Sequence, residues 1–157
     1  MDLRRLSILL FTAGLVLASA PAMAATSDQK AVMAMVQQFA DGINKGDMKL
    51  TAAACASPAI VIDDFAPHVW SGPNACADWA IGFVADNKKN GSTDLALTLG
   101  TPWHVDITGD TAYVVVPANF TYTANGKREA ENGSVYTAAL KKTSTGWRIT
   151  GWAWAGH

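Results

Sequence analysis

The chain has 157 residues, of which 50% are hydrophobic and 16% are charged, and its formal net charge is −1 at pH 7. Its lysines and arginines are scattered, which excludes the basic patch of a nucleic-acid-binding protein and the lysine run of a protein held on an anionic membrane. Aromatic surface on the scale of its six tryptophans is rarely left in water. We therefore expect these side chains in the core, in a pocket or at an interface.

Residues 1–24 have the pattern of a secretory signal peptide. Two arginines precede an apolar run, and Ala22-Met23-Ala24 has the small residues that are typical of a cleavage site. The run is shorter than the about 18 to 20 apolar residues that a membrane-spanning helix needs. We expect cleavage after Ala24, a mature single domain over residues 25–157 in the periplasm or outside the cell, and no association with a membrane.

Three helices are predicted in the first part of the mature chain. A capping box, T-x-x-Q, opens the first helix, in which apolar residues recur every three or four positions before residues 44–46 end it. An aspartate can cap a short second helix over residues 47–55. A third helix is expected to begin at Gly72-Pro73, with proline in its first position, and to end at Asn90-Gly91.

Strands are predicted where the apolar period changes to two. The run AIVID after Ser57-Pro58 is one strand, and alternating segments continue from Asp94 to the closing WRITGWAWA. Asn125-Gly126 is a hairpin signal, whereas Pro117 and Gly151 inside long strand patterns indicate bulges that bend a sheet. Helices followed by a curved antiparallel meander predict an α+β domain.

Cys55 and Cys76 are the two cysteines of the chain. In an oxidising compartment they could form a disulfide that closes a loop of about 20 residues and contributes about 3 kcal/mol in the chain-entropy model. They could equally be two small buried residues that never meet, because a sequence does not supply the Cα distance that decides. No metal site is expected, since neither cysteine has a histidine at ligand spacing.

Three segments, VQQFADGINKGD, AIVIDDFAPHVWSG and GWRITGWAWAG, occur in an order and spacing that resemble the nuclear transport factor 2-like superfamily. The match is to its SnoaL-like and ketosteroid-isomerase-like branch and covers nearly the whole mature chain. The resemblance implies a cystatin-like cone, in which a curved antiparallel sheet wraps around N-terminal helices and leaves a pocket at the open end. Because members of this superfamily include isomerases, dehydratases, cyclases and non-catalytic proteins, the resemblance implies the fold more than the function.

The resemblance places Asp63 where ketosteroid isomerases keep their proton-shuttling carboxylate. Strand alternation puts Asp63 on the same face as Val61 and Phe65, and burial at the lip of an apolar pocket would raise its pKa as a general base requires. The alternative is a solvated carboxylate where strand meets turn. His68 could pair with Asp63 or be an exposed loop imidazole. The substrate-polarising tyrosine of the family falls on Phe39, so standard steroid isomerisation is not expected.

Aromatic residues supply the expected pocket walls, although Trp79 and Phe83 are expected in the core. We expect a domain that binds a small apolar molecule without a cofactor, metal or nucleic acid, and that forms a homodimer. Asp63, helped by His68, would catalyse proton transfer of isomerase, dehydratase or cyclase type. The alternative is a non-catalytic ligand-binding or dimerisation module, in which the last-strand tryptophans are an interface. The residues expected to contact a ligand are Phe39, Trp70, Trp103, Tyr122, Trp152 and Trp154.

Overall fold

The computed structural model describes residues 25–156, so the predicted signal peptide and His157 lie outside the described residues. The described chain forms helices and strands in an order that matches the expected α+β class. The helices are α1 (Ser27–Lys45), α2 (Met48–Ala53) and α3 (Ala75–Asn90). The strands are β1 (Cys55–Ile62), β2 (Val69–Gly72), β3 (Ser92–Leu99), β4 (His104–Thr108), β5 (Thr111–Ala124), β6 (Lys127–Thr143) and β7 (Gly146–Ala155).

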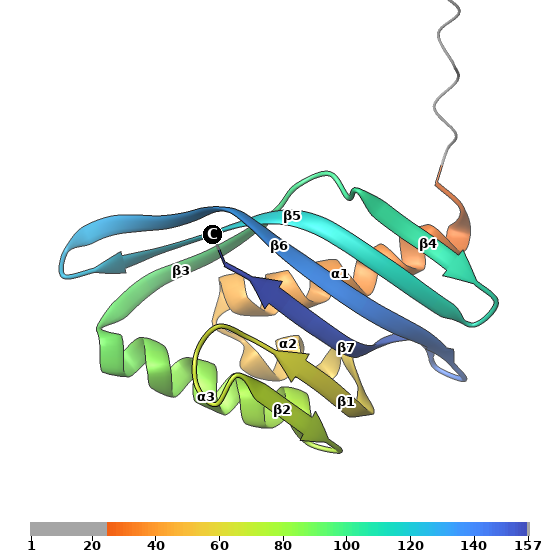
Figure 1. Ribbon diagram of the computed structural model, residues 1–157, viewed down its shortest axis with the longest axis horizontal. Coiled ribbons are helices and arrows are strands. Elements are labelled where there is room, and N and C mark those ends of the chain that lie inside the picture. The colour runs from red at the N-terminus through yellow and green to blue at the C-terminus, as the bar shows by residue number, and fades with distance from the viewer. Residues whose placement is uncertain (1–24, 157) are drawn as a thin grey trace, which may run out of the picture.

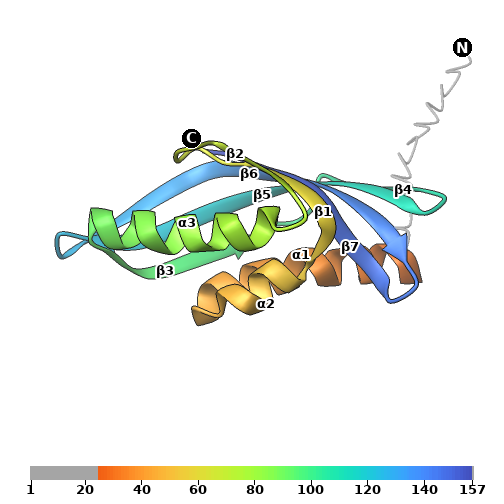
Figure 2. The ribbon, with the colours of Figure 1, turned by 90° about the horizontal axis from the view of Figure 1, so that it is seen from below.

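The strands form a single curved sheet in the order β2-β1-β7-β6-β5-β3, with β4 also paired to β5. Pairing is antiparallel except between β1 and β7, which run parallel. The sheet does not close on itself. Helix α1 lies in its concavity, and α3 contacts β1 and β2 at one edge as well as β3 at the other (Figures 1 and 2). The predicted cone is therefore confirmed, with α3 spanning the gap between the edge strands.

Two register shifts bend the long strands near the predicted bulge positions. In the β5–β6 pair the shift lies between Ala118 and Phe120, directly after Pro117. In the β6–β7 pair the shift falls beside Gly151, where Thr150 has no Cα partner. A bulge increases local twist and bends the strand that carries it. These shifts curve the sheet over α1.

Local signals at the helix ends are confirmed by hydrogen bonds. The Thr26 hydroxyl accepts the Gln29 N–H at 3.2 Å, and the Gln29 side-chain oxygen accepts the Thr26 N–H at 2.9 Å, which completes the capping box. Asp47 caps α2 by accepting the Leu50 N–H at 3.0 Å. Between these helices the chain turns at Gly46, whose φ of 66° favours glycine.

Two predicted boundaries were wrong. Helix α3 begins at Ala75 rather than at Gly72-Pro73, because Gly72 still belongs to β2 and pairs with Ala59. Strand β1 begins at Cys55 rather than after Ser57-Pro58, because its parallel partner β7 extends the pairing back to the start of the strand. Both differences come from strand pairing, which local propensity does not report.

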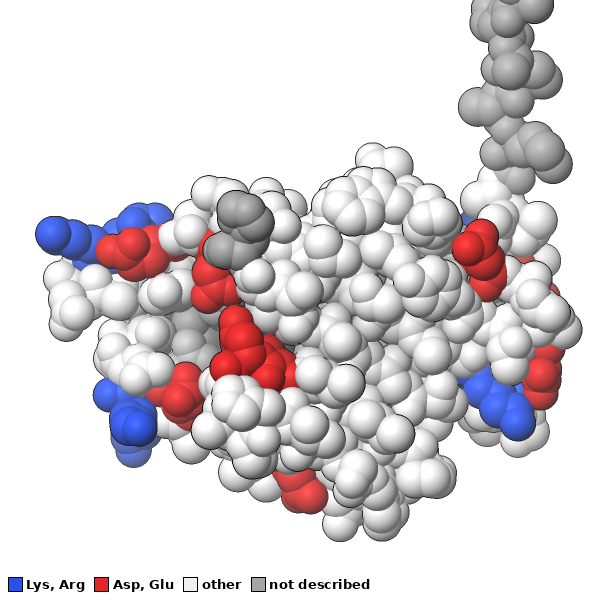
Figure 3. Space-filling view, viewed as in Figure 1, with Lys and Arg blue, Asp and Glu red and all other residues white. Residues whose placement is uncertain are grey.

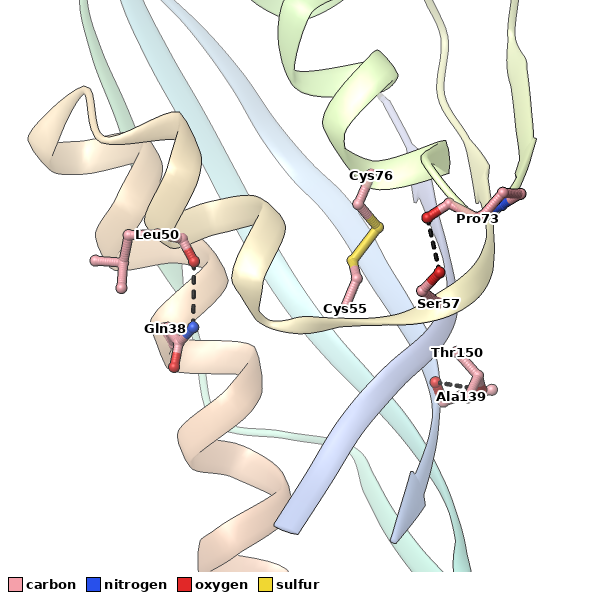
Figure 4. Close-up of a disulfide and its surroundings, with 8 residues drawn as sticks. All are labelled: Gln38, Leu50, Cys55, Ser57, Pro73, Cys76, Ala139 and Thr150. Atoms are coloured by element: carbon pink, nitrogen blue, oxygen red, sulfur yellow. Dashed lines mark hydrogen bonds between the residues drawn. A yellow bond between two sulfur atoms is a disulfide. The ribbon is translucent and has the colours of Figure 1, made fainter. Parts of the chain in front are cut away.

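Cys55 and Cys76 form a disulfide across 21 positions of sequence. It joins the start of β1 to the first turn of α3, which resolves the alternative that the sequence left open (Figure 4). Beside it the Ser57 hydroxyl donates to the Pro73 carbonyl at 2.9 Å. These two links hold the beginning of α3 against the sheet.

The interior contains a hydrophobic cluster that runs along α1 and the inner faces of β5, β6 and β7. Its largest fully buried side chains include Trp79, Tyr136, Leu140 and Ile149. Within residues 25–156, none of the helices has the length and apolarity that a membrane span requires.

Candidate functional site

A cavity of about 310 Å³ lies at one end of the cone. It is bordered by α1, α3, the turn after β1, and strands β3, β5, β6 and β7, so it combines residues from most of the chain. Figure 3 shows a hollow on this face, with acidic side chains gathered beside it. The lining residues are Phe39, Ile43, Asp63, Asp64, Phe65, Trp79, Phe83, Asp86, Asn87, Asn90, Ser92, Leu97, Phe120, Tyr122, Ala124, Glu131, Trp152 and Trp154.

The walls of the cavity are a continuous series of aromatic rings. Trp152 is central, because its ring centroid lies 4.8 Å from that of Trp79 and 4.9 Å from that of Phe39. Trp79 stacks on Phe83 at 5.1 Å, and Phe83 continues to Phe120 at 6.0 Å. Trp79 belongs to the core cluster, as expected, with Phe83 packed against that cluster, and both rings also line the cavity. Ring contacts of this kind hold side chains rigidly and form flat apolar surfaces suited to small molecules.

Asp63 lies in this aromatic environment, directly after the last residue of β1. Asp63 is only 9% exposed, and Val61 on the same face is fully buried. The predicted alternation of strand faces therefore holds. One carboxylate oxygen accepts the Trp79 indole N–H at 2.7 Å, and the other accepts the Asp64 main-chain N–H at 2.8 Å. The carboxylate is therefore fixed in orientation from two directions.

Burial raises the pKa of Asp63 to about 7, although the hydrogen bonds from Trp79 and Asp64 act in the opposite direction. The nearby negative charge of Asp64 adds to the increase. A group with this pKa is present in both protonation states near neutral pH and can therefore accept and return a proton.

Three further carboxylates line the cavity, those of Asp64, Asp86 and Glu131. Burial, followed by repulsion from Asp64, raises the pKa of Glu131 above its ordinary value, and a hydrogen bond from Trp154 opposes this effect. No lysine, arginine or histidine occurs among the lining residues in the described part of the chain. Sequence reasoning missed Glu131 and Asp86. Glu131 pairs with Phe120 of β5 in the sheet. This pairing is what places Glu131 at the cavity, and it cannot be read from the sequence.

The expected side-chain pair between His68 and Asp63 is not formed. The His68 Nδ1 atom lies 3.3 Å from the main-chain oxygen of Asp63, not from its carboxylate. The turn causes this arrangement: the Asp63 N–H donates to the His68 carbonyl, and His68 has a φ of 71°. His68 is exposed and does not line the cavity, so the structure corresponds to the alternative of a loop imidazole.

The aromatic residues expected to contact a ligand divide into two groups. Phe39, Tyr122, Trp152 and Trp154 line the cavity. Two others do not line it. Trp70 packs on the outer side of Phe65 with centroids 5.0 Å apart. Trp103 is 61% exposed, because it precedes β4 and its N–H is held by the Val115 carbonyl away from the cavity.

Phe39 is 3% exposed and presents no hydroxyl to the cavity, as its sequence position indicated. Tyr136 is buried beside it, with ring centroids 5.1 Å apart. Burial raises the pKa of Tyr136 well above its ordinary value, so this phenol stays protonated. Tyr136 is not among the lining residues. Among the described residues, Tyr122 is therefore the tyrosine that lines the cavity.

Within residues 25–156, no group of three or more His, Cys, Asp or Glu residues is arranged to hold a metal ion. The acidic lining residues are spread around the cavity instead of converging on one point.

Comparisons with known proteins agree with this architecture. A family model described as a SnoaL-like domain matches residues 11–153. A protein of the NTF2-like type with a cystatin-like fold from Novosphingobium aromaticivorans is 19% identical, with a TM-score of 0.67 over 82% of this chain and 81% of the other. Among curated proteins, none matches the sequence.

Two further solved structures have names that concern activity. A provisionally named dehydratase of the NTF2-like family from Streptomyces avermitilis is 18% identical, with a TM-score of 0.68 over 83% of this chain and 97% of the other. A ketosteroid isomerase-like protein from Erwinia carotovora atroseptica is 16% identical, with a TM-score of 0.64 over 83% and 96%. At these identities the likeness shows a shared fold and no more.

Proposed function

This chain belongs to the family of SnoaL-like domains, and from the geometry of its cavity we propose that it is an exported domain that binds a small hydrophobic molecule. We further propose that Asp63 transfers a proton in cofactor-free chemistry of the isomerase, dehydratase or cyclase type. The observation that carries this proposal is a buried carboxylate with a pKa of about 7 in an aromatic cavity.

The size and chemistry of the cavity support the binding part of the proposal. Its volume of about 310 Å³ is at the lower end of the range that small-molecule sites occupy. Rigid rings such as Trp79 and Trp152 offer flat apolar contact area with little loss of conformational entropy on binding. A compact ring system with few rotatable bonds therefore fits this cavity best.

The contacts of Asp63 support a role as a base. Each carboxylate oxygen accepts one hydrogen bond, from Trp79 or from the Asp64 main chain, and keeps a second lone pair that can take a proton. After accepting a proton from a carbon atom of the substrate, the neutral acid can return it to a second atom. The two N–H donors hold the group in place through both steps, so little reorganisation is needed.

Export is supported by the chemistry of the two cysteines. A disulfide between Cys55 and Cys76 persists in the periplasm or outside the cell, whereas reducing systems keep such pairs open in the cytosol of most organisms. The signal-peptide pattern of residues 1–24 points to the same compartment.

A second candidate function is non-catalytic binding in the same cavity, and one observation favours it. In reactions that pass through an enolate, hydrogen bonds that stabilise the developing oxyanion usually contribute more to the rate than any other single effect. Phe39 stands where a donor would be expected, and Tyr136 does not line the cavity. A protein that only holds its ligand requires no such donor.

Solvent-deuterium exchange tests the proton-transfer proposal without knowledge of the natural substrate. Small aryl ketones are incubated with the protein in deuterium oxide, and loss of the proton next to the carbonyl is followed by NMR. We expect exchange with the native protein and a loss of at least about 100-fold in Asp63→Asn, the usual scale for removal of a general base.

Asp78→Asn is the matched control, because Asp78 is an exposed aspartate of α3 that does not line the cavity. It should exchange at the native rate. Equal rates in the native protein and Asp63→Asn would refute the catalytic role. If both proteins then bind the ketones with the same affinity, the non-catalytic binding function takes its place.

A further inference from the structure

We propose that the cavity selects a positively charged ligand, namely a small aromatic or alicyclic amine in its ammonium form. This inference rests on the proposed small-molecule binding function and adds the chemical class of the ligand. It combines two independent features of the same cavity, the distribution of charged side chains and the aromatic walls.

The charged side chains that line the cavity are all acidic. Asp63 and Asp64 come from the turn after β1, Asp86 from α3 and Glu131 from β6. Four carboxylates from three separate segments thus border the same cavity, and no basic side chain lies among the described lining residues. A surface with mixed charges would normally place lysine or arginine near such a cluster, since unbalanced carboxylates repel one another.

The basic residues nearest in sequence lie elsewhere. Lys88 and Lys89, in the last turn of α3, and Lys127 are exposed and do not line the cavity. The Arg128 guanidinium is held outside by the main-chain oxygen of Asp94 and the hydroxyl of Thr121. Figure 3 shows the same separation, with acidic side chains beside the hollow and basic ones farther out.

Two of the carboxylates that line the cavity, Asp63 and Glu131, lie where their ionised forms are disfavoured. Burial and the charge of Asp64 act on both Asp63 and Glu131 and favour their protonated forms. A bound ammonium group would compensate these charges, because an opposite charge nearby favours the ionised form of a carboxylate. The C-terminal end of α3, which supplies Asn87 and Asn90 to the lining, adds the partial negative charge of a helix terminus.

The aromatic walls favour the same class of ligand. The faces of tryptophan, tyrosine and phenylalanine attract cations, most strongly where water is excluded. Trp79 and Trp152 meet edge to face at 4.8 Å, and Trp154 approaches Phe120 in the same manner at 6.5 Å. The rings of Phe120, Tyr122 and Trp154 are partly exposed and border the same cavity as the carboxylates. A hydrophobic ring carrying an ammonium group would use both the apolar walls and the acidic rim.

Three probes of nearly equal size separate charge from shape: 2-naphthylmethylammonium, 2-naphthylmethanol and 2-naphthoate. Their affinities for the mature protein are measured by isothermal titration calorimetry near pH 7.5 and low salt. We expect the ammonium to bind at least about tenfold more tightly than the alcohol, with the carboxylate weakest. This preference should shrink as salt is raised from about 50 mM to about 500 mM, because the rim is open to solvent.

Asp64→Asn and Glu131→Gln test the source of the preference. Each should reduce the ammonium-to-alcohol affinity ratio by about threefold or more, with the neutral alcohol as the reference for any change in cavity shape. Glu129→Gln is the matched control, because Glu129 lies two residues away on β6, is exposed and does not line the cavity. The ammonium-to-alcohol affinity ratio of Glu129→Gln should equal that of the native protein.

The outcomes distinguish this inference from the function on which it rests. If the alcohol binds as tightly as the ammonium, the inferred ligand class is wrong and the proposal of a hydrophobic pocket stands. If none of the three probes binds below about 1 mM, both proposals fail. An ammonium preference that survives Asp64→Asn and Glu131→Gln unchanged would show that the acidic rim does not select the charge, which also refutes the inference.

Discussion

The two ends of the cone are built from the same strands but differ in how they are filled. At the packed end, Leu140 of β6 and Ile149 of β7 are 1% and 0% exposed. At the open end, Tyr122 of β5, Glu131 of β6 and Trp154 of β7 stay partly exposed around the cavity. The strands run continuously from one end to the other, so the difference lies in the side chains and in the helices that cover them.

This comparison shows how a single sheet can provide both stability and a binding site. At the packed end, branched side chains such as Leu140 and Ile149 are buried, and protein interiors of this kind are normally close-packed. Large flat rings stack on one another at the open end, and charged groups such as Asp64 and Glu131 cannot be packed into a dry core without partners. Residues that would be poor for packing are thus concentrated where the cavity is.

The largest expected effect comes from removing one tryptophan at each end of β7. Trp147→Ala should lower the free energy of unfolding by about 3 to 5 kcal/mol, because Trp147 is buried at the packed end. Trp154→Ala should cost less than about half as much, since this ring borders a cavity that already exists. Urea denaturation of the ligand-free protein measures both values. Equal losses would mean that the two ends are packed alike.

The disulfide offers a second way to test the comparison. It holds the first turn of α3, whereas the helix from Trp79 to Asn90 lines the cavity. Replacing Cys55 and Cys76 together by alanine should lower the free energy of unfolding by about 3 kcal/mol, because the unfolded chain gains the freedom of the opened loop. Hydrogen exchange should then accelerate in α3 more than in α1. A loss below about 1 kcal/mol, or uniform acceleration, would contradict this.

A further effect is expected from pH, and it is specific to the open end. The pKa of Asp63 is about 7 in the folded protein and near 3.8 in the unfolded chain. Between these two pH values the folded protein holds a proton on the Asp63 carboxylate, and unfolding releases this proton. The stability contributed by Asp63 is fully present below pH about 4 and is lost as pH rises through about 7, by at most about 4 kcal/mol.

Urea denaturation from pH 4 to pH 8 checks this prediction against Asp63→Asn, which cannot titrate at that position. Other carboxylates titrate in both proteins, so the difference between their two curves isolates Asp63. The native protein should lose more stability than the variant as the pH rises. Parallel curves would mean that Asp63 is solvated and would weaken its assignment as a base.

Several features could be predicted from the sequence because they depend on local physics. The capping box at Thr26 and the end of α1 at Gly46 follow from side-chain hydrogen bonding and from glycine's freedom at positive φ. The inward direction of Asp63 follows from strand alternation. The boundaries of β1 and α3 could not be predicted, since they depend on which strands pair with β1.

The candidate site was predictable only in part, for the same reason. Phe39 and Trp152 line the cavity as predicted because each lies in a strongly periodic element, and Asp63 does so because it directly follows β1. His68 was not, because the turn determines whether its ring reaches the carboxylate or the main chain of Asp63. Trp103 has the right chemistry for a ligand site but lies 61% exposed beside β4.

The sequence by itself determined the fold class, the periodic faces of the helices and strands, and one inward-facing carboxylate, because these follow from interactions between residues close in the chain. The tertiary structure alone decided that Cys55 and Cys76 are joined and that Trp79 donates to Asp63. It also brought Glu131 to the same cavity as Asp64. These contacts depend on strand register and on the position of α3 across the open sheet, which residue types and spacing do not specify.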